Sequence, residues 1–180
     1  MNEQNIIHLD NLTEEEREQF TKVLGKASEE PSKESRVWKP KKIDQYYYIN
    51  DFTDVCTDTW QEAGADYKRF KIGNVYKTRE EVCFALERAK VKAELKRYAL
   101  EHNDPEKEAW NNDNGHYMIA FNHRVNDLFI TRGYYIEEES ATCFTSAPIA
   151  RDAIEAVGEE RILKYIFGVE VEEWAKSDND

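Results

Sequence analysis

The chain has 180 residues, of which 40% are hydrophobic and 34% are charged, and its net charge is −12 at pH 7. This hydrophobic content excludes a disordered chain, and the length suffices for one domain, or two small ones, with a buried core. The negative charge disfavours nucleic acid as a partner of the molecule as a whole and is compatible with a basic protein surface as partner.

The cysteines and the N-terminal sequence bear on cellular location. Cys56, Cys83 and Cys143 are far apart and form no CxxC pair, which argues against a disulfide framework and against a cysteine zinc site. The N-terminus lacks the basic and apolar regions of a signal peptide, and no run approaches the roughly 20 apolar residues that span a bilayer. The sequence therefore predicts a cytoplasmic protein without membrane contact.

The first predicted element is a helix over residues 12–27. Thr13 and Glu16 have the spacing of a capping box, and an apolar stripe that includes Phe20 follows them. The polar segment 28–36, which contains a proline, is typical of a linker.

A group of aromatic-rich strands is predicted to begin after Trp38. Residues 45–49 and 54–60 have the composition of two strands joined by a turn. Residues 67–77 are predicted as a third strand with a bulge or tight turn at Gly73. The most regular helical pattern of the chain follows directly after this strand.

That helix covers residues 78–103. Thr78 and Glu81 form a second capping box, and apolar residues recur along it at helical spacing. Residues 103–115 are rich in Asn, Asp and Gly and are predicted to form a loop.

The second half of the chain repeats this plan. Strand patterns lie in 116–122, 127–138 and 140–146, and a helix with a break at Gly158 is predicted over 146–167. A shift of 68 positions aligns the two halves, and the pairs that it matches indicate an internal duplication. These pairs include Tyr76 with Phe144, Thr78 with Ser146, Glu87 with Glu155, and Leu95 with Leu163.

The predicted fold class is α+β, with an N-terminal helix followed by two duplicated units of antiparallel aromatic-rich strands plus a capped helix. The N-terminal helix and linker occupy 1–36. The first unit of three strands and a helix occupies 37–104, and the second unit, with an acidic C-terminal tail, occupies 105–180.

Motifs for catalysis or cofactor binding are not found in the sequence. None of the seven glycines forms a phosphate-binding loop, and neither HExxH nor GxSxG occurs. His116 and His123 are seven residues apart, but no third ligand has a recognisable metal spacing, which favours a polar histidine at a strand end. We therefore predict no catalytic residue, no metal and no cofactor.

Six glutamates are the candidate partner-binding residues. A dense run in the second unit can meet an Arg/Lys patch on a partner, although a solvated turn between strands gives the same pattern. Three further glutamates lie on the second predicted helix. The six residues are Glu137, Glu138, Glu139, Glu155, Glu159 and Glu160.

Six basic residues in the first unit are candidates for nucleic-acid binding. They lie near several aromatic residues in the sequence, which is the mixture found in single-strand-binding proteins. The same pattern arises when tyrosines pack under a helix and lysines keep the other face of the sheet soluble. The six residues are Lys39, Lys41, Lys42, Lys68, Arg69 and Lys71.

Several longer stretches together carry a resemblance to known proteins: LTEEERE, WKPK followed by YYYI, IGNVYKTREEVCFALERAKVKAELKRYA, and AIEAVGEERILKYIFGVE. Over roughly 12–171 the chain resembles small acidic accessory proteins of phages, prophages and other mobile elements of Gram-positive bacteria. Most of those proteins have no assigned activity, so the resemblance assigns no catalytic residues. It implies the context of a mobile element, in which small acidic proteins include anti-CRISPR inhibitors of Cas nucleases.

Three hypotheses follow. The first is a non-enzymatic protein in the host cytoplasm that inhibits a nucleic-acid-handling defence protein, such as a CRISPR–Cas9-type nuclease or its guide complex. The second is an accessory module that binds single-stranded or structured nucleic acid through the basic, aromatic first unit. The third is an enzyme with an unrecognised carboxylate site.

Overall fold

A computed structural model describes residues 13–28, 37–111, 113–134 and 140–170. The chain divides into two compact units, Met1–Trp38 and Lys39–Asp180, which are described separately below.

The N-terminal unit, Met1–Trp38, contains one described helix, α1 (Glu14–Ser28). The predicted capping box is confirmed, since the Thr13 amide donates to Glu16 Oε2 at 2.8 Å and the Glu16 amide donates to Thr13 Oγ1 at 3.4 Å. The bonds that the Glu16 carboxylate accepts from the Thr13 amide and from the Thr13 hydroxyl hold the pKa of this carboxyl below its ordinary value. Phe20 is half-buried, and the side chains of residues 23–28 lie outside the described part of the chain.

The larger unit, Lys39–Asp180, begins with an antiparallel hairpin of β1 (Gln45–Ile49) and β2 (Val55–Thr59), as predicted. Tyr76 adds a third segment, because its backbone exchanges two hydrogen bonds of 2.9 Å with Tyr47. The hairpin and this bridge form the first lobe of the unit together with α2 (Gly64–Lys71).

The predicted strand over 67–77 is wrong for most of its length, because α2 begins before it and extends to Lys71. Asp66 closes the first turn of this helix by accepting a hydrogen bond from the Ala63 amide at 3.0 Å. Tyr67 and Phe70, three residues apart, both pack edge-on against Trp60, which is a helical spacing rather than a strand spacing.

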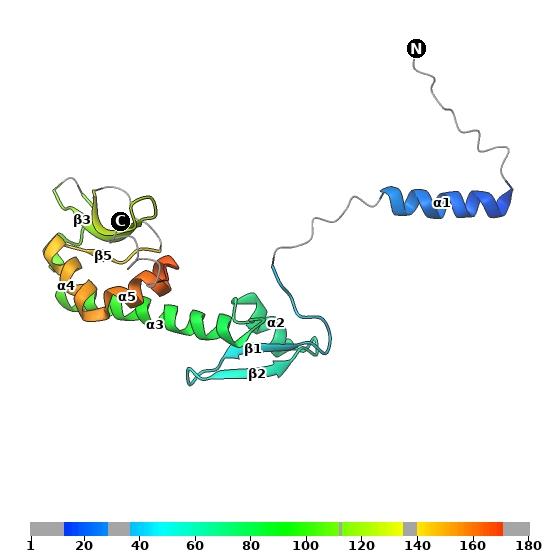
Figure 1. The fold of residues 1–180 in the computed structure, drawn as a ribbon, viewed down its shortest axis with the longest axis horizontal. Helices are drawn as coiled ribbons and strands as arrows, with labels where there is room; N and C mark the ends of the chain where they lie inside the picture. The colour runs from blue at the N-terminus through cyan, green and yellow to red at the C-terminus, as the bar shows by residue number, and fades with distance from the viewer. Residues whose placement is uncertain (1–12, 29–36, 112, 135–139, 171–180) are drawn as a thin grey trace, which may run out of the picture. The chain divides into compact units, whose positions relative to one another are not determined.

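The long helix α3 (Arg79–His102) connects the two lobes (Figure 1). Its capping box is confirmed, since the Glu81 amide donates to Thr78 Oγ1 and the Thr78 amide donates to the Glu81 carboxylate. The helix contacts β1 and β2 in the first lobe and packs against α4 and η3 in the second. It is followed by a short 3₁₀ helix, η2 (Pro105–Lys107).

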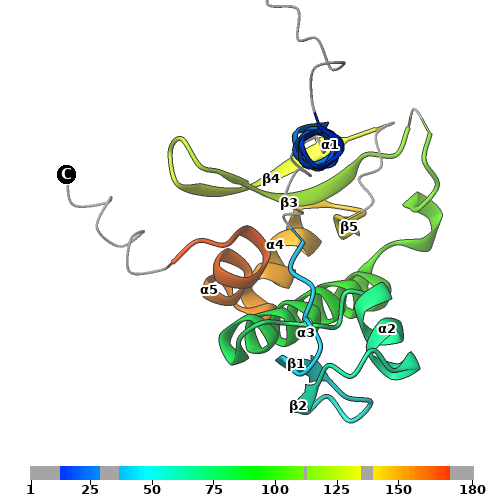
Figure 2. The same cartoon turned by 90° about the vertical axis from the view of Figure 1, so that its right-hand side faces the viewer.

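The second lobe contains a three-stranded antiparallel sheet in the order β4-β3-β5. Its helix α4 lies between this sheet and α3 (Figure 1, Figure 2). The predicted break is confirmed, because Gly158 has a φ of 98° and separates α4 from α5. The elements of this lobe are β3 (His116–Asn122), β4 (Asp127–Gly133), β5 (Cys143–Phe144), α4 (Ala147–Val157), α5 (Glu159–Ile162) and η3 (Leu163–Phe167).

The two lobes share a similar order of elements, although in the first lobe α2 lies between the hairpin and the pairing segment. In each lobe a hairpin is followed by a segment that pairs back on the first strand of the hairpin, and a capped helix comes next. Tyr76 and Phe144 occupy the equivalent pairing positions, and Thr78 and Ser146 are the equivalent N-cap residues. The α+β class with an N-terminal helix and two small antiparallel sheets is confirmed.

The main core lies in the second lobe and joins α3 to the repeated unit. Phe144 of β5 and Ile162 of α5 are fully buried against the α3 residue Val91. Residues 39–180 therefore form one compact unit, in which α3 contributes to the packing of both lobes.

Candidate functional site

An aromatic cluster organises the first lobe, and Trp60 is its centre. Trp60 is 1% exposed and meets Tyr46, Tyr67 and Phe70 in edge-to-face contacts, with ring centroids 5.4 to 6.1 Å apart. Tyr46 is fully buried, whereas Tyr67 is exposed and Phe70 is half-buried, so the cluster fills the interior of the lobe and reaches its surface at these two rings.

Lys39, one of the six basic candidates, lies against this cluster. Its ammonium is 5.8 Å from the Trp60 ring centroid, 5.2 Å from that of Tyr67 and 5.8 Å from that of Phe70. A cation over three aromatic rings is attracted by their negative faces, so the rings hold the ammonium of Lys39 against the lobe, at whose surface the residue is exposed.

Arg69, another candidate, is part of a hydrogen-bonded chain. Its Nη1 donates to Asp58 Oδ2 at 2.7 Å and to the Tyr46 hydroxyl at 2.6 Å, and that hydroxyl donates to Asp66 Oδ1 at 2.8 Å. The guanidinium also lies 3.6 Å from the ring centroid of Tyr48. Arg69 thus neutralises carboxylates within its own lobe.

The pKa values in this chain follow from its geometry. Burial, followed by the hydrogen bond to Asp66, raises the pKa of Tyr46 to about 12. Burial alone would raise the pKa of Asp66, but hydrogen bonds from the Gln61 amide, the Tyr46 hydroxyl and the Ala63 amide outweigh it and lower that pKa. Asp66 is therefore a buried carboxylate that accepts three hydrogen bonds from its own lobe.

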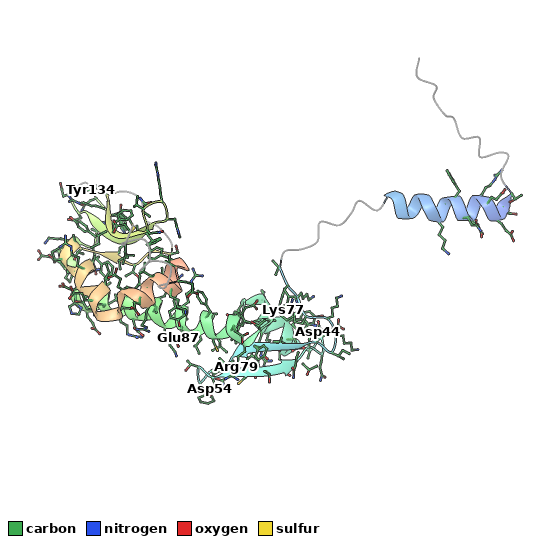
Figure 3. All side chains as sticks on the ribbon, viewed as in Figure 1. Asp44, Asp54, Lys77, Arg79, Glu87 and Tyr134 are labelled. Carbon is green, nitrogen blue, oxygen red and sulfur yellow. The ribbon has the colours of Figure 1, made fainter. Side chains whose placement is uncertain are left out.

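The other four basic candidates remain on the surface. They are exposed, and none forms an ion pair within the described part of the chain. Two further cations that the sequence reasoning missed, Lys77 and Arg79, lie on the same lobe (Figure 3). The four candidates are Lys41, Lys42, Lys68 and Lys71.

The acidic candidates separate into two groups. Glu155 on α4 and Glu159 and Glu160 on α5 are exposed, and none has an ion-pair partner among the described residues. Glu137, Glu138 and Glu139 lie outside the described residues.

A salt bridge fixes the helix that carries two of these glutamates. Arg161 of α5 donates to both carboxylate oxygens of Glu94 on α3, at 2.6 and 3.0 Å. The hydrogen bond from Arg161 lowers the pKa of Glu94, so the pair is charged at neutral pH. Glu159 and Glu160 therefore stand on a helix anchored to the centre of the molecule.

A cavity of about 540 Å³ lies between α3 and residues 140–145, and the sequence reasoning did not foresee it. We call it the α3 cavity. His116 lines it, is 3% exposed and stacks on Trp110 with ring centroids 3.8 Å apart. Two lysines of α3, Lys92 and Lys96, also line it.

The structure places His116 and His123 apart. His116 begins β3 and His123 follows its last residue, so the two stand at opposite ends of the strand. Within the described ranges, no group of three or more His, Cys, Asp or Glu side chains is placed to hold a metal ion.

None of the helices in the described ranges combines the length and the apolar character that a membrane span requires. Comparisons with protein-family models, with curated proteins and with solved structures find no match for this chain.

Proposed function

We propose that this chain is a non-enzymatic protein of a phage or other mobile element that inhibits a nucleic-acid-handling defence protein of the host. The proposed target is a CRISPR–Cas9-type nuclease or its guide complex. The mechanism is occupation of a basic channel by the acidic surface of the second lobe, with electrostatic attraction steering the association. The context comes from the resemblance of the sequence, and the choice of surface comes from the structure.

The separation of charge between the lobes carries this proposal. Residues 39–79 contain eight Lys and Arg against six Asp and Glu, whereas residues 103–170 contain six against thirteen. In the first lobe, Lys39 and Arg69 direct their charge at aromatic rings and carboxylates of the lobe itself. In the second lobe, Glu155, Glu159 and Glu160 are exposed without an ion pair among the described residues. The unneutralised negative charge of the second lobe thus lies where a basic partner can reach it.

Neutralising these three glutamates is expected to weaken binding to the nuclease. In biolayer interferometry with a Cas9–guide complex, E155Q/E159Q/E160Q should raise the dissociation constant about tenfold, mainly through a slower association rate. The wild-type association rate should fall as salt is added, and the variant should show a smaller dependence.

The matched control removes three exposed carboxylates elsewhere, in D51N/E62Q/E101Q, and has the same net charge. It should bind like the wild type. Equal weakening by the two triple variants would show that only net charge matters, and equal binding of all three proteins would reject the acidic face as the binding surface.

A second candidate function is favoured by the four lysines that remain exposed in the first lobe. If Lys41, Lys42, Lys68 and Lys71 contact the phosphates of a single strand, their replacement by alanine should reduce the slope of log affinity against log salt by about 3. A mobility-shift assay with single-stranded DNA and RNA at low salt measures this. The control R88A/R97A/R124A/R151A should leave the slope unchanged, and absence of any shift at low salt would exclude this function.

A further inference from the structure

We propose that the α3 cavity is a nucleotide-binding site. The ligand class is a phosphate-bearing group with a flat heterocyclic base that carries an N–H donor. Three features of the cavity point to this chemistry: two cations and a buried acceptor, all three without a partner among the described residues, and an aromatic stack.

The cations are Lys92 and Lys96, which are one turn apart on α3 and therefore lie on the same side of the helix. Both are exposed and line the cavity, and neither forms an ion pair within the described ranges. Lys92 also lines an adjoining cavity of about 130 Å³. Two neighbouring ammonium groups at the edge of a cleft suit a phosphate, which offers several oxygens to them.

The aromatic stack consists of Trp110 and His116, whose rings are inclined by only 11°. Trp110 is half-buried and lines the cavity. A base that stacks on an aromatic side chain gains contact regardless of its sequence identity, because every base has a flat face. The stack therefore provides the apolar part of the site, next to the cationic part.

The buried acceptor is Nδ1 of His116. The other ring nitrogen, Nε2, lies 3.2 Å from the Glu108 carbonyl oxygen. A carbonyl oxygen only accepts, so Nε2 carries the hydrogen and Nδ1 of the neutral ring is an acceptor. Nδ1 is buried and has no hydrogen-bond partner among the described residues. The amino and imino groups of nucleobases are donors that can supply the missing hydrogen bond to this nitrogen.

Part of the polar wall of the cavity is used for structure, while Glu108, Ser140 and Thr142 also line it. The Asn103 side chain donates to the Cys143 carbonyl at 3.1 Å and accepts from the Thr145 amide at 3.0 Å. The Thr145 hydroxyl oxygen accepts from the Asp104 amide at 2.9 Å. These bonds join the end of α3 to β5, so the cavity is held open by a fixed frame. Its volume lies within the range of small-molecule sites.

The same chemistry occurs in a free nucleotide and in the terminal nucleotide of a single strand. Isothermal titration calorimetry of the full-length chain distinguishes these sources with five probes: 5′-AMP, 5′-UMP, adenosine, inorganic phosphate and a 5′-phosphorylated tetranucleotide. We expect at least one mononucleotide to bind. Adenosine and phosphate should each have an affinity at least about tenfold lower, because each lacks one half of the contacts. Tighter binding of the tetranucleotide than of both mononucleotides would assign the site to strand ends.

Three variants test the residues. K92A/K96A should weaken mononucleotide binding about tenfold or more, and because both lysines are exposed this variant leaves the fold intact. H116F keeps a ring against Trp110 but removes the acceptor, and W110L removes the stack, so each should weaken binding. The control K68A/K71A removes two exposed lysines of α2 and should bind like the wild type.

Several outcomes would overturn the proposal. It fails if neither mononucleotide nor the tetranucleotide releases heat at millimolar concentration. It also fails if phosphate alone binds as tightly as the nucleotides, or if K92A/K96A binds them unchanged. As an independent readout, the ¹⁵N resonance of His116 Nδ1 should shift when the nucleotide is added to the wild-type protein, and an unchanged resonance would also contradict the site.

Discussion

Replacement of Asp66 by alanine is expected to lower the free energy of unfolding by about 2–4 kcal/mol. The side chain is 3% exposed and accepts three hydrogen bonds, from the Tyr46 hydroxyl and from the amides of Gln61 and Ala63. Its loss leaves the buried hydroxyl of Tyr46 without an acceptor and removes the closure of the first turn of α2. Urea denaturation at pH 7 measures the change, and D51A, at an exposed position, should cost less than about 0.5 kcal/mol.

The same residue predicts a dependence of stability on pH. Because the folded-state pKa of Asp66 lies below the ordinary value of 3.8, its contribution to stability is complete above about pH 4 and is lost as the pH falls through the lowered value. D66N cannot titrate, so the stability that the wild type holds over the variant at pH 7 should shrink at pH 3. A constant difference between pH 7 and pH 3 would show that Asp66 does not contribute as a carboxylate.

Replacement of Phe144 by alanine is expected to cost about 3–5 kcal/mol. Phe144 is fully buried in the core cluster of the second lobe, where it packs with residues of α3, α4 and α5. The deleted ring leaves a cavity that this fixed frame of helices fills only in part. Thermal or urea denaturation followed by circular dichroism measures the loss.

Phe129 on β4, which lies on the other side of β3 in the same sheet, is 41% exposed and provides the control. F129A should cost less than about 1 kcal/mol. Similar losses for F144A and F129A would mean that the second lobe has no core centred on Phe144, which would contradict the described packing.

Local signals predicted α1, α3 and α4 and the residues at which they begin. The pairs Thr13–Glu16 and Thr78–Glu81 are recognisable in sequence because a capping box involves residues only three positions apart. The similar order of elements in the two lobes was also predictable, since each lobe has its own hydrophobic pattern and its own N-cap.

The segment 64–71 shows why the prediction failed elsewhere. Basic and aromatic residues are mixed there, a composition that fits both a strand and one face of a short helix. Two contacts favour the helix over the strand. Trp60 packs against two residues of one helical face, and Asp66 accepts a hydrogen bond that closes the first turn. Both contacts depend on tertiary structure, which cannot be inferred from the periodicity of apolar residues in the sequence.

The candidate sites were predictable only as lists of charges. The sequence does not distinguish Arg69, which is bound to Asp58 and Tyr46, from Lys68, which is free of ion pairs within the described ranges. The α3 cavity was missed for a related reason. Its walls come from α3, from the loop near Trp110, from the start of β3 and from residues 140–145, which only the fold brings together.

The central claim is that the acidic face of the second lobe binds and inhibits a nucleic-acid-handling defence protein. DNA cleavage by a Cas9–guide complex, mixed with this chain before the target is added, tests it most directly. We predict that the wild type and D51N/E62Q/E101Q block cleavage and that E155Q/E159Q/E160Q needs about tenfold more protein for the same effect. Complete cleavage in the presence of excess wild-type protein would contradict the account with Cas9 as target, and equal inhibition by both triple variants would contradict the acidic face as its mechanism.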